Sequence, residues 1–164
     1  MNVAPDVDEA DLAAVTAQLG REPRGVLAVA HRCPCGQPSV VRTAPRLPDG
    51  TPFPTLYYLT CSRLAARIGT LESEGRMREL TERLAADPEL AAAYQRAHEA
   101  YLAARDAIEP LGTGVSAGGM PDRVKCLHVH AAHALAAGPG VNPVGDEVLA
   151  ELGEWWRSGP CAST

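Results

Sequence analysis

The stretch "PSVVRTAPRLPDGTPFPTLYYLT", residues 38–60, decides the predicted fold because it contains two strand-like segments joined by a turn. Its two ends, 38–44 and 54–60, are rich in β-branched and aromatic residues and are bounded by Gly and Pro, a composition typical of strands. The "PDG" sequence at 48–50 predicts a chain reversal between them, so the two strands should pair antiparallel. A similar segment, "RGVLAVAHR" at 24–32, precedes them. The three segments together predict a small three-stranded meander.

The rest of the chain has the pattern of helices. A first helix is predicted before the strands, with Asp6 or Asp8 as its N-cap and Gly20 as its C-terminal signal. From Cys61 onward the apolar residues recur with a period near 3.6, which is typical of amphipathic helices. The helices expected there are 62–75, 76–87, 88–109, 123–138 and 144–156. This order of elements, with the strands before most of the helices, predicts an α+β fold. A small antiparallel three-stranded sheet in the N-terminal half should be covered by about five to six helices.

Length and composition bound the domain organisation. The 164 residues are 46% hydrophobic and 21% charged, which is typical of one globular domain. We therefore expect a single α+β domain over residues 1–156, followed by a disordered tail over residues 157–164. Cys161 falls in that tail and is left out of the predicted sites.

Charge and hydropathy exclude several classes of function. The net charge of −5 argues against a general nucleic-acid binder, which would carry a basic surface. The chain has no run of about eighteen apolar residues, and its acidic N-terminus lacks the basic region of a secretory signal. A cytoplasmic protein without membrane or nucleic-acid partners is expected. In a reducing cytoplasm, the five cysteines favour thiols, metal ligands or catalysts over structural disulfides.

The segment "RVKCLHVHAAHALAAG", residues 123–138, carries an unusual density of soft metal ligands. If the whole segment is helical, Cys126, His130 and His133 lie on one face, because they are separated by three, four and seven positions. His128 would then point nearly the opposite way. A face of this kind supplies up to three ligands and needs others to complete a tetrahedral site.

The missing ligands are expected from the strand region. Cys33 follows the first predicted strand and Cys61 follows the third, so both reach one site if those strands end at the same edge of the sheet. Thiolates and imidazoles suit zinc, or an iron–sulfur cluster if most ligands are sulfur, which is the less favoured alternative. Whether Cys35 or His128 contributes stays open. The predicted metal ligands are Cys33, Cys61, Cys126, His130 and His133.

Two other interpretations stay open beside the metal site. Buried cysteines often pack as small hydrophobic residues, and a helical histidine often only donates one hydrogen bond. Alternatively, Cys61 is a catalytic nucleophile, because a thiol at a helix start faces unpaired backbone N–H groups that favour the thiolate, with His130 as its base. Arg63 or Arg32 would then hold an anion, and the glycine-rich segment 111–121 could close over the site.

Three longer stretches carry a resemblance to a known family. They are "RCPCGQPSVVRTAPRLPDGTPFPTLYYLTC" (32–61), "AHEAYLAARD" (97–106) and "GTGVSAGGMPDRVKCLHVHAAHALAAGPGVNPVGDEVL" (112–149). Over about residues 24–150 the chain resembles the domain of unknown function 501 family, which is bacterial and common in actinobacteria. Ser62 departs from the proline that follows the third-strand cysteine in that family. The resemblance implies that six residues occupy motif positions, namely Cys33, Cys61, Cys126, His128, His130 and His133.

The resemblance implies no activity. Genes of the family often lie near those for enolase, a septum-formation initiator and an exopolyphosphatase, which implies a link to cell division or polyphosphate metabolism. We expect a soft-metal site that is either structural or hydrolytic, acting on an unknown small molecule or protein partner. The alternative class is a non-enzymatic interaction module, which an exposed apolar patch with Trp155, Trp156 and Phe53 would favour.

Overall fold

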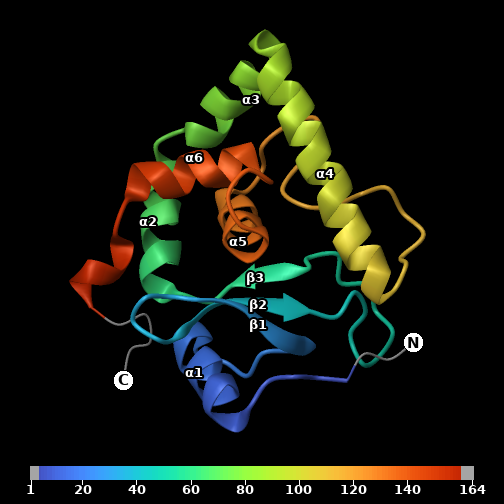
Figure 1. The fold of residues 1–164 in the computed structure, drawn as a ribbon, viewed down its shortest axis with the longest axis vertical. Helices are drawn as coiled ribbons and strands as arrows, with labels where there is room; N and C mark the ends of the chain where they lie inside the picture. The colour runs from blue at the N-terminus through green and yellow to red at the C-terminus, as the bar shows by residue number, and fades with distance from the viewer. Residues whose placement is uncertain (1–3, 160–164) are drawn as a thin grey trace.

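The computed structural model describes residues 4–159 and has the predicted α+β fold. A three-stranded sheet lies between helix α1 on one face and the remaining helices on the other (Figure 1). The strands are β1 (Val26–Arg32), β2 (Pro38–Thr43) and β3 (Tyr57–Leu59). The helices are α1 (Glu9–Leu19), α2 (Ser62–Ser73), α3 (Arg76–Ala86), α4 (Pro88–Ile108), α5 (Leu127–Ala137), α6 (Pro143–Leu152) and the 3₁₀ helix η1 (Trp155–Ser158).

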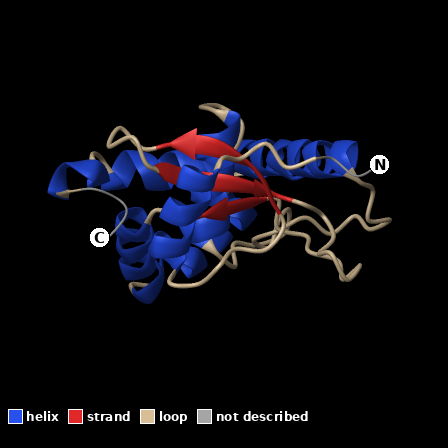
Figure 2. Cartoon of the chain, turned by 90° about the horizontal axis from the view of Figure 1, so that it is seen from below, coloured by secondary structure: helices blue, strands red, loops and turns tan. Residues whose placement is uncertain are grey.

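The sheet is the predicted meander, with the order β1-β2-β3 and both pairs antiparallel. The three strands lie side by side in the middle of the molecule (Figure 2). Strand β3 is shorter than the predicted 54–60. The backbone N–H of Leu56 donates to the hydroxyl of Tyr101 in α4 at 2.6 Å, so that this N–H does not pair with β2. Pro54 has no N–H to contribute to a ladder.

Both faces of the sheet are covered because successive side chains of β2 point to opposite sides. Val41 packs with Val26 and with Val15 of α1 in a small core. Val40 points the other way into the main core, which is built largely from aliphatic residues of the helices. The layer of helices α2 to α6 is therefore held to the sheet by one face of β2 and β3.

Helix α5 begins later than the sequence predicts. The pattern places its start at residue 123, whereas the regular helix begins at Leu127 and Cys126 is an extended N-cap residue with φ of −153°. The preceding residues form turns instead, in which the N–H of Lys125 donates to the carbonyl of Gly118 at 2.8 Å. Gly118 has a φ of +64°, and a Cβ there would lie 2.6 Å from Nε2 of His130, so this turn requires glycine.

The C-terminal part also differs in detail from the prediction. Helix α6 ends at Leu152, because Gly153 leaves the helical conformation with φ of +62°, and η1 follows. Residues 157 and 158, predicted as the start of a tail, belong to η1. Residues 160–164, and Cys161 with them, lie outside the described residues. Among residues 4–159, no helix combines the length and apolar character needed to cross a membrane.

Candidate metal centre

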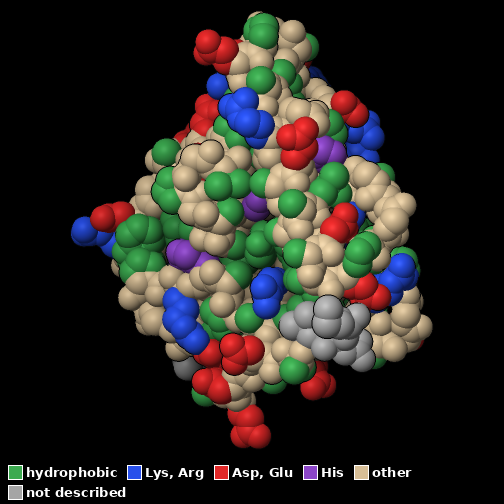
Figure 3. All heavy atoms as spheres, turned by 45° about the vertical axis from the view of Figure 1, so that its right-hand side comes forward, with side chains coloured by type: hydrophobic (Ala, Val, Ile, Leu, Met, Phe, Trp, Pro, Cys, Tyr) green, Lys and Arg blue, Asp and Glu red, His purple; other side chains and the backbone are tan. Residues whose placement is uncertain are grey.

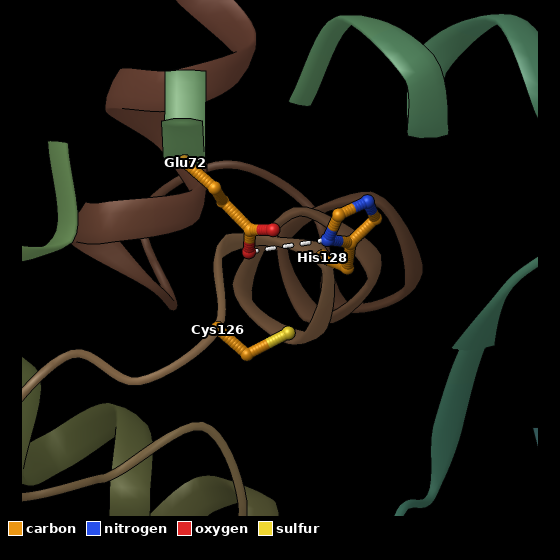
Figure 4. Close-up of side chains that lie close together, drawn as sticks. All are labelled: Glu72, Cys126 and His128. Carbon is orange, nitrogen blue, oxygen red and sulfur yellow. Dashed lines mark hydrogen bonds and ion pairs between the residues drawn. The ribbon is translucent and has the colours of Figure 1, made fainter. Parts of the chain in front are cut away.

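Three potential metal ligands converge where the C-terminal half of α2 meets the N-terminus of α5. Glu72 comes from α2, Cys126 is the N-cap residue of α5, and His128 lies in the first turn of α5. One carboxylate oxygen, the thiol sulfur and one imidazole nitrogen all lie within 4.8 Å of one another, with the side chains directed toward a common point (Figure 4). Within residues 4–159, this is the one group of three or more such ligands at that spacing.

Glu72 is held in this place by the start of α5. The first backbone N–H groups of a helix have no partner within the helix, and the Cys126 side chain makes no capping hydrogen bond. Glu72 Oε2 accepts the N–H of Leu127 at 2.8 Å and therefore caps α5 from a different helix. The negative carboxylate is also favoured at the positive end of the helix dipole. The hydrogen bond to Leu127 therefore holds the Glu72 carboxylate in position without a bound ion.

His128 is oriented by contacts on both ring nitrogens. Nε2 lies 3.1 Å from the carbonyl oxygen of Ala65, and because a carbonyl only accepts, Nε2 carries a hydrogen and donates. Nδ1 is then the nitrogen that faces Glu72, at 3.2 Å from Oε2. A hydrogen bond with Cys126 raises the pKa of His128 to about 9; burial opposes this rise, and the charge of Glu72 adds to it. A proton therefore occupies Nδ1 at neutral pH, on the side where a cation would bind.

A pocket of about 360 Å³ adjoins this group. Cys126 and His128 line it, and the rest of its wall is mostly apolar or aromatic. His128 is about one-third exposed and Glu72 about one-fifth, so the group is accessible from solvent. A reactive group beside an apolar pocket is the usual arrangement of a small-molecule site. Other residues of the wall are Leu19, Thr55, Tyr57, Tyr58, Leu59, Ala65 and Val129.

Cys33 and Cys61 meet at a second place. Strands β1 and β3 are not neighbours, but both are antiparallel to β2 and therefore run in the same direction, so their C-terminal ends share one edge of the sheet. Cys33 follows β1 and Cys61 follows β3, and their sulfur atoms lie 3.9 Å apart in the core. The indole N–H of Trp155 donates to the sulfur of Cys33 at 3.4 Å. The two cysteines therefore lie close together, as expected, although β2 separates the strands that they follow.

His130 and His133 lie at a third place, within the core. The side-chain amide of Asn142 bridges them, because its Nδ2 lies 3.1 Å from Nδ1 of each ring while its oxygen accepts the N–H of Gly145. His130 Nε2 donates to the carbonyl of Gly118 at 3.1 Å. Burial lowers the pKa of both histidines to about 4. Both imidazoles are therefore neutral at pH 7.

The structure thus divides the five predicted metal ligands among three places. The helical face of Cys126, His130 and His133 does not form, because Cys126 precedes the helix and the three-and-four spacing does not apply to it. His128, predicted to point away, is the histidine that lies beside Cys126. No local pattern in the sequence marks Glu72, since 56 residues separate it from His128.

The geometry around Cys61 differs from the predicted nucleophile site. Cys61 is the N-cap residue of α2, and its sulfur accepts the N–H of Leu64 at 3.4 Å. This contact agrees with the predicted position of the thiol at the start of a helix. Its exposure, however, is 0%, so a substrate cannot reach it in this conformation. The predicted base, His130, makes its hydrogen bonds to Tyr94, Gly118 and Asn142.

Arg32, one of the two predicted anion clamps, and the predicted closing loop are also engaged elsewhere. Arg32 forms an ion pair with Asp11 of α1. The fully buried Arg105 donates to the carbonyl oxygens of Val115 at 2.7 Å and Thr113 at 3.2 Å, which anchors the glycine-rich segment to α4.

The aromatic patch proposed for an interaction module is not exposed. Trp155 is 5% exposed, and Trp156 and Phe53 are partly buried. Among the residues that the structure describes, Val115 is the one large hydrophobic residue that is exposed. Trp155 and Trp156 do line an open groove of about 610 Å³ with Leu135 and Leu149.

The fold and this group of side chains define an α+β protein with a candidate Glu/Cys/His metal centre beside a pocket. The sequence model of DUF501, described as a protein of unknown function, matches residues 29–150. The chain therefore belongs to the DUF501 family, as the resemblance of its motifs implied. No curated protein and no solved structure matches it.

Proposed function

We propose that the protein binds a zinc ion through Glu72, Cys126 and His128 and carries out a hydrolytic reaction in the adjoining pocket. The observation that carries this proposal is the convergence of one oxygen, one sulfur and one nitrogen within 4.8 Å. Three protein ligands leave a fourth position open, as in catalytic zinc sites, whereas structural sites are closed by four. At such a position zinc supplies a Lewis acid for hydrolysis.

The chemistry of the donors favours zinc over the iron–sulfur alternative. A borderline-soft ion such as zinc accepts thiolate, imidazole and carboxylate together, and a carboxylate and a thiolate would balance its charge. Iron–sulfur clusters need several thiolates, and this group has one.

The hydrogen bond on the other ring nitrogen of His128 also favours a metal ligand role. A metal-binding histidine usually donates its other N–H to a carbonyl or carboxylate, which fixes its tautomer. His128 has this contact with Ala65, while Nδ1 is directed toward Glu72 and Cys126. Zinc would replace the proton on Nδ1. A cytoplasmic location, which we also propose, would keep the Cys126 thiol reduced for this role.

The first test is elemental analysis of untagged protein purified without chelators. We expect about one zinc per chain in the wild type and a loss in Glu72→Gln, Cys126→Ser and His128→Gln. Glu74→Gln is the matched control, since Glu74 lies at the end of the same helix but is exposed. A double Cys33→Ser, Cys61→Ser variant tests the other thiol pair. Zinc that persists in the first three variants and disappears in the double variant would overturn the assignment.

One observation favours a second candidate, in which Cys126 rather than Cys61 is a catalytic nucleophile. Cys126 is partly exposed, lies at a helix N-terminus and lies beside His128, whose pKa is raised to about 9. The sulfur thus lies near the imidazole of His128 and the positive end of the helix dipole. Its test is alkylation of the metal-free protein. Faster modification of Cys126 in the wild type than in His128→Gln supports it, and equal rates contradict it.

A further inference from the structure

Arg42, in β2, has one buried N–H group that no other described residue satisfies. Its Nε is buried and has no hydrogen-bond partner among the residues that the structure describes. Desolvating an N–H of a charged group without a partner is unfavourable, so native proteins pair such groups with a residue, a water molecule or an ion. The unsatisfied Nε is therefore a sign that a group from outside the chain belongs beside Arg42.

Tyr57 of β3 lies directly beside Arg42. The two residues are register partners in the antiparallel pair of β2 and β3, so their side chains project from the same face of the sheet. That face is the one covered by α5, because the Tyr57 ring stacks on the His133 ring with 5.9 Å between centroids and 14° between planes. Burial raises the pKa of the Tyr57 hydroxyl, and the charge of Arg42 acts in the opposite direction. The positive charge of Arg42 therefore acts on the Tyr57 hydroxyl.

His133 adds a third hydrogen-bond donor. Asn142 donates to its Nδ1, so the ring hydrogen is on Nε2, and within residues 4–159 nothing accepts it. The residue is only 2% exposed. Asp146, whose charge acts on His133, accepts a hydrogen bond from the backbone of Gly140. Figure 3 shows histidine side chains set among hydrophobic ones on one face of the molecule, with Lys or Arg side chains close by.

We propose that Arg42, Tyr57 and His133 form a binding site for an oxyanion group, either a phosphate or a carboxylate, between the sheet and α5. A guanidinium fork matches the oxygens of both groups, and a hydroxyl and an imidazole N–H complete the set of donors. The site does not depend on the metal. Tyr57 also lines the pocket beside Cys126 and His128, so the oxyanion site adjoins that pocket.

The test is calorimetric titration of the chelator-treated, metal-free protein with inorganic phosphate and, separately, with acetate. We expect one of the two anions to bind and Arg42→Gln to weaken it by about tenfold or more. Arg67→Gln is the matched control, because Arg67 is exposed on α2, and it should bind like the wild type. The anion that binds more tightly identifies the source as a phosphate or a carboxylate ligand. Absence of binding by both anions would overturn the proposal.

A further variant and a second titration separate this site from misfolding and from a metal effect. Tyr57→Phe keeps the ring that stacks on His133 and removes only the hydroxyl, so it should fold normally and bind the anion more weakly. The same titration repeated on zinc-loaded protein should still show the binding that Arg42→Gln weakens, because none of the three donors is a proposed zinc ligand. Anion binding that occurs only in the zinc-loaded protein and is unchanged in Arg42→Gln would instead assign the anion to the metal centre, and the proposal would be wrong.

Discussion

Glu72 Oε2 lies 3.2 Å from His128 Nδ1, although the two residues are 56 positions apart and belong to different helices. The same carboxylate oxygen accepts the N–H of Leu127. One side chain therefore has a structural role, the capping of α5, and a position suited to binding a cation. These two roles can be separated by experiment, because capping acts on stability and ion binding acts on metal content.

Glu72→Ala should lower the free energy of unfolding by about 1–2 kcal/mol, since it removes the acceptor for a helix-start N–H. Glu74→Ala, at the exposed end of the same helix, should change it by less than about 0.5 kcal/mol. Urea unfolding of metal-free protein measures both. Equal stability of the two variants would show that Glu72 does not cap α5.

Zinc affinity should rise with pH up to about 9. The pKa of His128 is raised to about 9, so below that value zinc must displace a proton from Nδ1. Competition with a chromophoric chelator at several pH values measures the affinity. An affinity that is constant between pH 6.5 and 8.5 would contradict a role for His128 as a ligand.

Acid should destabilise the fold through His130 and His133. Their pKa values in the folded protein, about 4, are below the ordinary value of 6.5, so as the pH falls the unfolded chain takes up protons first. The free energy of unfolding therefore decreases from pH 6.5 to pH 4, by roughly 3 kcal/mol for each histidine. His133→Phe keeps an aromatic ring against Tyr57 and should reduce the dependence of the free energy of unfolding on pH. Urea unfolding at several pH values measures this dependence. An unchanged pH dependence in this variant would show that groups other than His133 cause the acid sensitivity.

Gly145→Ala should destabilise the protein strongly. A Cβ at this position of α6 would lie 2.0 Å from the carbonyl oxygen of His130, so α5 and α6 would have to move apart. Overpacking of this kind costs about 1–3 kcal/mol or more. Gly69→Ala is the matched control, because a Cβ there meets nothing within 4 Å and alanine favours the α2 helix. Thermal unfolding should give a lower midpoint for the first variant and an equal or higher one for the second.

Local patterns in the sequence predicted most of the fold. Segments rich in β-branched and aromatic residues and the "PDG" turn indicated the meander, and the 3.6-residue period indicated the helices. Both signals depend on neighbours in the chain. The start of α5 was missed by four residues, since Gly118 and the turns after it are stabilised by contacts with His130 that the period does not encode. That shift removed Cys126 from the helical face assigned to it.

The sequence by itself determined the α+β class, the order of elements and the family, all of which depend on local spacing and extended motifs. Only the tertiary structure decided which ligands meet. Cys33 and Cys61 come together because β1 and β3 run in the same direction on either side of β2. Glu72 reaches His128 because α2 packs against the start of α5. Such contacts join residues distant in the chain, so they follow from packing and not from periodicity.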